Sequence, residues 1–284
     1  MSKYFTFPAL LSYSFLLFSN LLIAQGRDVE RFRERYKVPS GKVFHVKVDI
    51  DAAEVKIFKS LRENEAWITI YYTEDEFKVY VDFDEERSRL DVKFDKRGWM
   101  DSDEEDLKAN FALELPYGVE IDFETKIKAG EVELDLGGLS IVEFDLKTWA
   151  GEVLVEFSEP NKSEMNYLDI NTKIGETDLV RLGNARFRDA EINGGIGEMT
   201  IDFRGELLPK ARASVDLDIG ETNIILPQDV GIKLSVSKFL FMSNINLPYR
   251  FKKSGRYYYS KNYDDAANQF TLKVSPGLGE LQIE

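Results

Sequence analysis

The chain contains no cysteine and a single histidine. Without cysteine there can be no disulfide, thiolate zinc site, cysteine nucleophile or lipidated cysteine. A single histidine excludes a metal site built from several imidazoles. Basic residues are also few, 37 against 51 acids, and the net charge of −14 argues against a nucleic-acid partner, because phosphate binding needs a basic footprint. The 284 residues, 43% of them hydrophobic, are enough for a sizeable core in one or two domains.

The only long apolar run lies at the N-terminus. Lys3 supplies a short basic end, and the run from Ala9 to Ala24 is interrupted only by uncharged polar residues. This pattern, with the small Ala24 before Gln25, predicts a signal peptide over residues 1–24 that is cleaved near Ala24. The alternative is a retained anchor helix, since the run approaches the ~20 residues that span a bilayer. We therefore expect an exported protein of the periplasm or the cell surface.

Residues 25–41 form a separate charged N-terminal segment. Its central part reads RDVERFRERYK from Arg27 to Lys37, and its charges alternate in sign as on a short solvated helix. Pro39, Ser40 and Gly41 then end it. The segment is either a cap over the end of the next domain or a mobile spacer, and both interpretations stay open.

An internal repeat organises the rest of the chain. Each copy has an apolar residue, then Gly-Glu, then alternating side chains, and Ala53-Glu54-Val55 resembles a degenerate first copy. The first five repeat glycines follow one another at intervals of 21, 24, 22 and 23 residues, and the last interval is 59. The repeat glycines are Gly130, Gly151, Gly175, Gly197, Gly220 and Gly279.

Alternation with period two on both sides of each glycine predicts two strands joined at a glycine corner. Glycine suits such a corner because it tolerates a positive φ and a close approach of neighbouring backbone. A unit of about 22 residues cannot bury its apolar face alone, whereas stacked units can. The sequence thus predicts an all-β fold, a parallel β-solenoid of ~22-residue rungs, with an antiparallel sandwich as the alternative.

A less regular β region precedes the repeat. No linker separates this region from the repeat, so we expect a single domain over residues 42–284. The strands predicted in it are Val43–Ile50, Glu54–Phe58, Ala66–Tyr72, Phe77–Phe83 and Leu90–Phe94.

Two further short sequence motifs resemble those of a known family. A strand ends in a Pro-aromatic-Gly turn before the next strand within Ala112–Ile121, and the chain closes with Gly-x-Gly-Glu-x-x-Ile over Gly277–Ile283. Together with the Gly-Glu repeats, they resemble the toast-rack family of bacterial candidate adhesins and the related C-terminal domains of cell-wall-stress response proteins. The resemblance covers most of residues 42–284. It implies a right-handed β-solenoid and an exported or envelope-associated role, and it brings no catalytic motif.

Several carboxylates and the histidine could in principle bind a metal or act as a catalytic base, but for each of them a structural or surface role is favoured. The glutamates after the repeat glycines would stack about 4.8 Å apart and could bind divalent cations, yet a solvated acidic edge is favoured. Asp101–Asp106 lacks EF-hand spacing and is predicted to be a charged loop, and His45 is predicted to be a surface or rim histidine rather than a base, which would need positioned partners. We predict no catalytic residue, no metal and no cofactor. The glutamates are Glu131, Glu152, Glu176, Glu198, Glu221 and Glu280, with Glu54 as a further member.

The long interval in the repeat holds the most informative segment, Val230–Tyr263. It contains seven basic residues, many aromatic residues and no acid. Aromatic rings stack on flat faces and basic groups pair with carboxylate or phosphate, so the segment suits an anionic or sugar-containing surface. The alternative is an excursion that packs its rings on the body and pairs its bases with acidic edges. The candidate patch is Lys238, Arg250, Lys252, Lys253, Arg256, Tyr257, Tyr258 and Tyr259.

These observations predict a non-enzymatic envelope or surface protein, adhesin-like by resemblance, that acts as a binding or scaffolding module. One alternative is a regulatory module of an envelope-stress sensing system, and another is a polysaccharide-acting enzyme on a β-solenoid. The expected partners are an anionic glycan, an envelope component or another envelope protein. Because the chain ends at Ile283 and Glu284 inside a repeat, an open terminal edge would also allow self-association.

Overall fold

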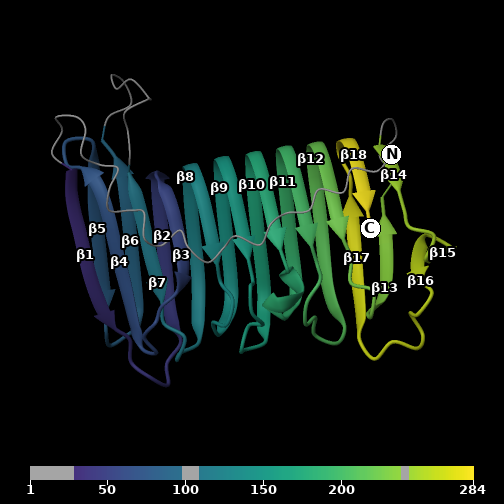
Figure 1. The fold of residues 1–284 in the computed structure, drawn as a ribbon, viewed down its shortest axis with the longest axis horizontal. Helices are drawn as coiled ribbons and strands as arrows, with labels where there is room; N and C mark the ends of the chain where they lie inside the picture. The colour runs from purple at the N-terminus through teal and green to yellow at the C-terminus, as the bar shows by residue number, and fades with distance from the viewer. Residues whose placement is uncertain (1–28, 98–108, 238–242) are drawn as a thin grey trace.

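The computed structural model describes residues 29–97, 109–237 and 243–284. Over these ranges the chain is all-β, with eighteen strands joined in one sheet and no α-helix. The strands follow one another along a single long axis (Figure 1). The predicted signal peptide with its cleavage position near Ala24, the acidic run Asp101–Asp106 and Lys238 lie outside the described residues.

Five long strands form the middle of the sheet. Each pairs in parallel with the next strand in chain order, so the chain advances along the axis one strand at a time. The all-β, mostly parallel architecture predicted from the repeat is confirmed, and the antiparallel sandwich is excluded for this part. The five strands are β8 (Ile121–Asp135), β9 (Ile141–Glu156), β10 (Met165–Val180), β11 (Phe187–Asp202) and β12 (Ala211–Ile225).

The repeat glycines stand opposite one another in register. Gly130 pairs with Gly151, and the row continues without a break to Gly220 and then Gly279. Their φ angles lie between +129° and +144°, a conformation that residues with a Cβ rarely adopt. A Cβ built at Gly151 would stand 1.9 Å from the carbonyl oxygen of Gly130, so the close approach of successive corners also requires glycine. Ala53 occupies the matching position before Gly130, as the degenerate first copy predicts.

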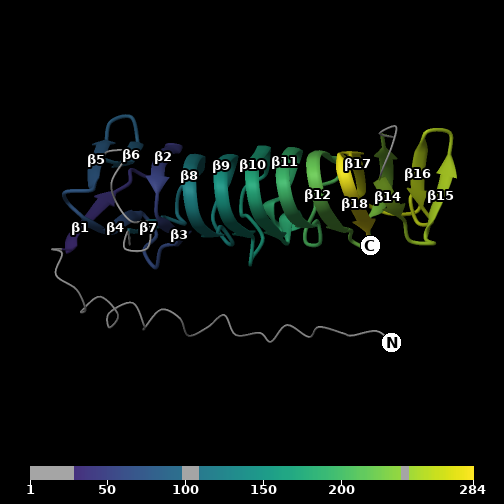
Figure 2. The ribbon, with the colours of Figure 1, turned by 90° about the horizontal axis from the view of Figure 1, so that it is seen from above.

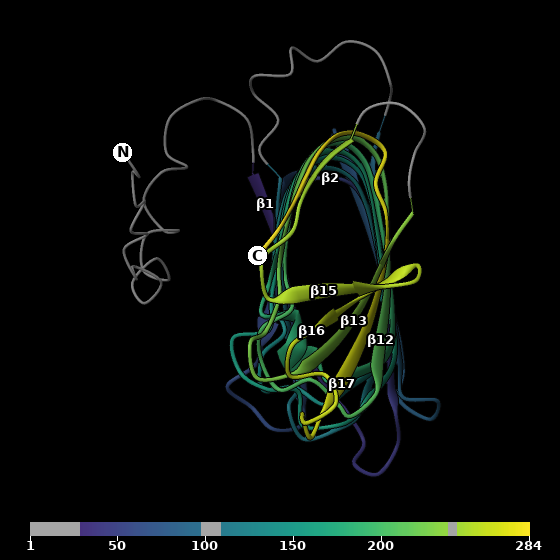
Figure 3. The same ribbon diagram turned by 90° about the vertical axis from the view of Figure 1, so that its right-hand side faces the viewer.

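Each long strand bends at its glycine and so contributes to two walls. Residues before the glycine pair along the first wall, and residues after it pair along the second. Every second side chain points between the walls, where apolar residues such as Leu134, Leu146 and Ile170 are fully buried. Phe123 and Phe144 stack there with 5.6 Å between ring centroids. Seen along the axis, the strands superpose in one narrow outline (Figure 3).

The N-terminal region extends both walls with shorter strands. The parallel pairing continues where two of them, β2 (Phe44–Ala52) and β3 (Glu54–Lys59), join β8 on either side of Ala53. The other strands include antiparallel pairs, which explains the weaker repeat in this part of the sequence. They are β4 (Glu65–Thr73), β5 (Phe77–Asp84) and β6 (Arg89–Lys96), close to the predicted ranges, and β7 (Asn110–Leu115), which ends at the predicted Pro-aromatic-Gly turn.

The charged N-terminal segment is a strand and not the predicted short helix. β1 (Val29–Lys37) pairs antiparallel with β4 along all nine of its residues. Its Phe32 and Tyr36 pack against the core, with the Tyr36 ring 5.1 Å from that of Phe83. These two apolar contacts and the free edge of β4 outweigh the helical charge pattern. Of the two open interpretations, the cap over the end of the domain is the one observed.

The C-terminal part closes the other end of the stack. The first wall continues from β12 through β17 (Gln269–Ser275) and β13 (Gly231–Val236) to the hairpin of β16 (Tyr257–Ser260) and β15 (Phe251–Ser254). The second wall continues from β12 through β18 (Leu278–Ile283) to β14 (Ser243–Asn246). The terminal strand β18 is therefore not the open edge predicted from the sequence, because the excursion folds back and pairs β14 with it.

Candidate functional site

The candidate patch lies at the C-terminal end of the stack. The hairpin of β15 and β16 crosses this end, in front of the space between the two walls (Figure 3). Lys233 of β13 stands opposite Tyr259, which in turn stands opposite Lys252 of β15. The long interval in the repeat thus builds one continuous end surface out of three neighbouring strands.

Alternation along the hairpin divides its aromatic residues into two sets. Phe251 and Tyr258 pack against the core and close the end of the stack. Gly255, with a φ of +62° and open space around it, makes the turn between the two strands. Tyr257 and Tyr259, two residues apart on β16, therefore fall on the opposite face from Tyr258. The predicted residue Tyr258 is thus structural, and its two neighbours are the ones available to a ligand.

Three tyrosines form a cluster on this outer face. The rings of Tyr257 and Tyr259 lie 6.2 Å apart at 65°, and those of Tyr259 and Tyr263 lie 4.9 Å apart at 72°. Edge-to-face geometry of this kind holds the rings in fixed relative positions. All three rings are half-buried, so each keeps exposed surface beside the basic residues.

Three basic residues of the segment lie over tyrosine rings of the hairpin. The Nζ of Lys233 is 4.3 Å from the centroid of Tyr257, and the guanidinium carbon of Arg256 is 4.9 Å from the same ring. Lys253 stands opposite Tyr258 and lies over that ring at 5.5 Å, so it shares the face of Tyr258, although its side chain is exposed. Each distance is within the range of a cation–π contact, which holds the side chain while its charge remains exposed.

None of these bases forms an ion pair with a carboxylate within the described parts of the chain. Bases on the body behave differently: Arg212 and Lys147 lie 2.6 Å and 2.7 Å from the oxygens of Asp189 and Asp145. Of the predicted alternative, the packing of rings on the body is observed for Phe251 and Tyr258, whereas the pairing of the described bases with acidic edges is not. Aromatic rings within the segment take the place of those carboxylates. We call this surface the end patch: Lys233, Lys252, Arg256, Tyr257, Tyr259 and Tyr263, together with the exposed Lys253 on the other face of the same hairpin.

Arg250 differs from the other predicted patch residues because its guanidinium is half-buried. It donates hydrogen bonds to the carbonyl oxygens of Pro227 at 3.0 Å, Leu226 at 3.3 Å and Glu284 at 3.2 Å. Burial lowers the pKa of Arg250 below its usual value. The residue therefore fastens the excursion to the end of β12 and β18, and we exclude it from the end patch.

An open hollow of about 660 Å³ lies next to Arg250. The exposed Tyr249 and Lys261 line one part of it, with the Lys261 Nζ 4.9 Å from the Tyr249 ring centroid. Asn262 lies beside them and donates to the carbonyl oxygens of Gln228 and Val230. The hollow adds a second cationic and aromatic surface to the same end of the molecule.

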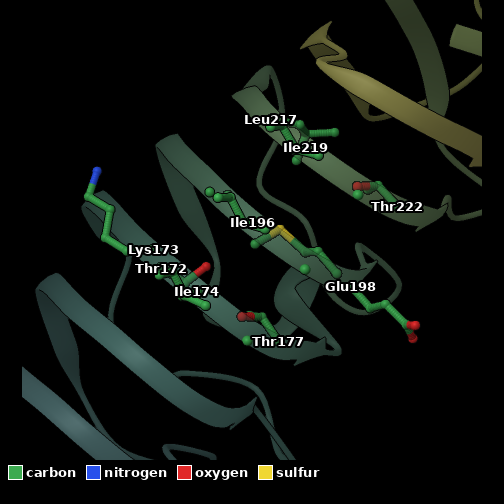
Figure 4. Close-up of a pocket in the computed structure, with 15 residues that line it drawn as sticks. Thr172, Lys173, Ile174, Thr177, Ile196, Glu198, Leu217, Ile219 and Thr222 are labelled. Atoms are coloured by element: carbon green, nitrogen blue, oxygen red, sulfur yellow. The ribbon is translucent and has the colours of Figure 1, made fainter. Parts of the chain in front are cut away.

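The hollows near the glycine corner are smaller. An open one of about 210 Å³ lies beside Glu131, Glu152 and Glu176. Another of about 20 Å³ beneath the corner is lined among others by Thr172, Thr177 and Leu217 (Figure 4). The volume of this second hollow suits a single water molecule and is too small for an organic ligand. The glutamates that follow the glycines form the predicted row and are all exposed. No group of three or more His, Cys, Asp or Glu side chains in the described ranges is arranged to hold a metal ion.

His45 makes one contact of note. Its Nδ1 lies 2.9 Å from a carboxylate oxygen of Asp122 on the neighbouring strand of the first wall, and the two side chains are 52% and 38% exposed. In the part of the chain that the structure describes, no helix has the length and apolar character needed to cross a membrane.

Two family profiles match the chain. The N-terminal domain of toast-rack proteins (DUF2154) matches residues 27–167, and the C-terminal domain described as cell wall-active antibiotics response LiaF matches residues 173–283. The junction between the two matches falls within β10, so it marks no interruption of the stack. No curated protein matches the chain significantly.

Solved structures that are similar to this chain have low sequence identity to it. A candidate cell adhesion protein from Clostridium sporogenes is 14% identical, with 89% of this chain and 99% of that chain covered and a TM-score of 0.43. A candidate adhesin from Bacteroides fragilis is 12% identical, with 90% and 97% covered and a TM-score of 0.34. From its two profile matches, the chain belongs to the toast-rack family, with a toast-rack N-terminal domain followed by a LiaF-like C-terminal domain.

Proposed function

We propose that the protein is an exported, non-enzymatic binding module that holds an anionic glycan of the cell envelope on its end patch. One observation carries the proposal: the bases of this surface lie on aromatic rings, not on carboxylates. Arginine and lysine so placed can pair with the carboxylates of a glycan, while Tyr257 and Tyr259 offer faces for its sugar rings. The acidic body, with its net charge of −14, repels the same polymer and so directs it to the end.

The mechanism is rigid display. Parallel strands hold the end patch on a stiff stack, and Phe251 and Tyr258, which pack against the core, fix the hairpin that carries it. We take the stack to be a right-handed β-solenoid with rungs of about 22 residues, as the repeat and the family resemblance predict. Little conformational entropy is then lost when the glycan binds.

Isothermal titration with polygalacturonate tests the proposal. The variant Lys252→Ala/Lys253→Ala/Arg256→Ala should bind at least about tenfold more weakly than the wild type, because each lost charge pair removes part of the contact. The control Lys78→Ala/Arg87→Ala/Lys93→Ala removes the same charge from β5, β6 and their connection and should bind as the wild type does. Equal binding by both variants would overturn the proposal, and release of shorter oligosaccharides would show an enzyme instead.

Export is the second part of the proposal. The N-terminal run predicts that residues 1–24 are removed, so the protein recovered from the periplasm or the cell surface should begin at Gln25. N-terminal sequencing of that protein gives the answer. A chain that starts before residue 24 and stays in the membrane fraction would instead indicate a retained anchor.

A regulatory module of an envelope-stress system is the second candidate. It is favoured by the match of residues 173–283 to the LiaF C-terminal domain, because this range includes the whole end patch. In that case the end patch would dock an acidic surface of a membrane sensor. Crosslinking in cells under envelope stress should then capture a membrane kinase with the wild type and not with the Lys252→Ala/Lys253→Ala/Arg256→Ala variant.

Self-association through strand edges would have to use the outermost strands. Among the described strands, β1, β5, β14 and β15 each pair with a single neighbour. β1, β5 and β15 carry charged residues and β14 is only four residues long, features that oppose pairing with a second copy. We therefore expect a monomer at micromolar concentration, and size-exclusion chromatography at several concentrations measures it.

A further inference from the structure

β1 carries a row of basic residues on one face. Phe32 and Tyr36 point into the core, so the alternating residues Arg31, Arg33 and Arg35 point outward, followed by Lys37. Successive members of this row are about 7 Å apart, twice the rise per residue of a strand. The acids of the same segment, Glu30 and Glu34, fall on the opposite face. The strand therefore separates charges that a helix would have mixed.

Two rings of β4 support the row. Arg31 stands opposite Tyr71 and lies 5.5 Å from its ring centroid. Arg33 and Arg35 lie 5.0 Å and 5.7 Å from the ring centroid of Trp67. A guanidinium held over a ring still has N–H groups at its edge that can pair with an anion.

Few carboxylates neutralise these bases. Glu65 lies 3.7 Å from Arg35, whose side chain is still 59% exposed. Glu114 stands opposite Trp67 and is half-buried, and burial raises its pKa while Arg33 opposes that shift. The row thus keeps an excess of positive charge in a strongly acidic protein. We call it the arginine face: Arg31, Arg33, Arg35, Lys37, Trp67 and Tyr71.

The arginine face and the end patch lie at opposite ends of the molecule. β1 and the hairpin of β15 and β16 are the outermost elements along the axis (Figures 1 and 2). In the second wall, ten pairings lead from β1 through β8 and β12 to β14. At about 4.8 Å for each pairing, the ends are separated by roughly 50 Å.

We propose that the arginine face is a second binding site for an anionic glycan, so that one protein molecule bridges two glycan chains. The ligand class follows from the chemistry of the face, where spaced guanidinium groups meet carboxylates and rings meet sugar faces. The bridging rests on the proposed function, because it needs the end patch as the other glycan site. Binding of a glycan to the arginine face does not depend on the end patch.

Trp67 reports binding at the arginine face alone. The experiment titrates trigalacturonate into the Lys252→Ala/Lys253→Ala/Arg256→Ala variant and follows tryptophan emission, with a Trp67→Phe derivative as the blank. We expect a saturable change that Trp67→Phe abolishes, and half-saturation at least tenfold higher when Arg31, Arg33 and Arg35 are also replaced by Ala. Arg33→Gln alone, which leaves the strand intact, should raise the half-saturation concentration of trigalacturonate at least threefold. No emission change, or equal half-saturation in all variants, would overturn the site.

Light scattering of polygalacturonate mixtures tests the bridging. The wild type should give scattering that rises and then falls as protein is added, because excess protein saturates each chain separately. The variant Arg31→Ala/Arg33→Ala/Arg35→Ala should still bind the polymer by titration but give no such maximum. An unchanged scattering maximum in this variant would overturn the bridging. If all polymer binding is lost in the Lys252→Ala/Lys253→Ala/Arg256→Ala variant and in no other, the proposed function stands and the second site is excluded.

Discussion

Gly175 stands directly against the backbone of Gly151: a Cβ at Gly175 would lie 1.9 Å from the carbonyl oxygen of Gly151. Its φ of +129° is also one that side chains rarely adopt. Every corner of the stack repeats this contact. The spacing of the walls therefore depends on the absence of a side chain along one continuous row.

Gly175→Ala should destabilise the protein by more than about 2 kcal/mol, because the clash is with backbone and cannot be relieved by a rotamer change. Urea unfolding followed by circular dichroism measures the loss. Gly41→Asn is the matched control: Gly41 also has a positive φ, of +79°, but no atom lies near its Cβ position. It should cost less than about 1 kcal/mol, since asparagine tolerates this conformation. Equal losses for the two variants would contradict the role of the close approach.

Asn161 ties three coils together at the loops opposite the glycine row. Its Oδ1 accepts from the Ile141 N–H at 2.8 Å, and its Nδ2 donates to the carbonyl oxygens of Ile141 at 2.7 Å and Ala185 at 3.3 Å. The side chain is fully buried. Asn161→Ala should lower the free energy of unfolding by about 2–4 kcal/mol, because it leaves buried backbone groups unpaired. Asn193→Ala, at a more exposed position, should change it by less than about 0.5 kcal/mol in the same denaturation series.

Asp169 is a source of pH dependence. Burial raises its pKa, and the neighbouring Asp145 raises it further. Such a carboxyl favours the folded state when protonated, so its stabilisation is present at low pH and is lost as the pH rises through the folded pKa. Asp169→Asn should therefore raise the stability at pH 7 by about 0.5 kcal/mol, an amount reduced by solvent screening, and should have little effect at pH 3.

Asp189→Asn is the control of opposite sign. The hydrogen bonds from Arg212 hold the pKa of Asp189 below its usual value, so its stabilisation is present at pH 7 and is lost as the pH falls through the folded pKa. This variant should be less stable than the wild type at pH 7 and equal to it at low pH. Thermal unfolding at pH 3, 5 and 7 compares the two. A parallel response of both variants would contradict the assignment.

Substitutions of Tyr258 and Tyr259 should distinguish an effect on stability from an effect on glycan binding. Tyr258 packs against the core, so Tyr258→Ala should reduce the stability by about 2–4 kcal/mol. Tyr259→Ala should leave stability within about 1 kcal/mol but weaken binding of polygalacturonate at least threefold, because it removes the centre of the tyrosine cluster. The pair is compared by thermal unfolding and by titration. Reversed effects would show that the two faces of the hairpin have been assigned the wrong way round.

The repeat and its alternation were sufficient to predict most of the fold. The spacing of Gly130, Gly151 and Gly175 predicted a parallel stack, and the structure places these glycines opposite one another. Local alternation predicted the strands of the N-terminal region to within about two residues, but not which of them pair antiparallel, because pairing partners are distant in sequence.

Two features escaped prediction for different reasons. The segment around Arg33 has a charge pattern that suits a helix, and only its contact with β4 selects the strand. The sequence did indicate the basic face of β1: Arg31, Arg33, Arg35 and Lys37 are spaced by two residues, which places them on one face if the segment is a strand. The pairing of β14 with β18 depends on how a 59-residue interval folds back, and no local pattern specifies that.

Hydrogen–deuterium exchange with and without polygalacturonate tests the central claim, that the ends of the stack bind the polymer through bases held on rings. At saturating polymer, the account predicts slower exchange over residues 249–263 and over residues 29–37, with unchanged exchange in β9, β10 and β11. Protection confined to those central strands, or none at either end while the polymer is bound, would contradict it.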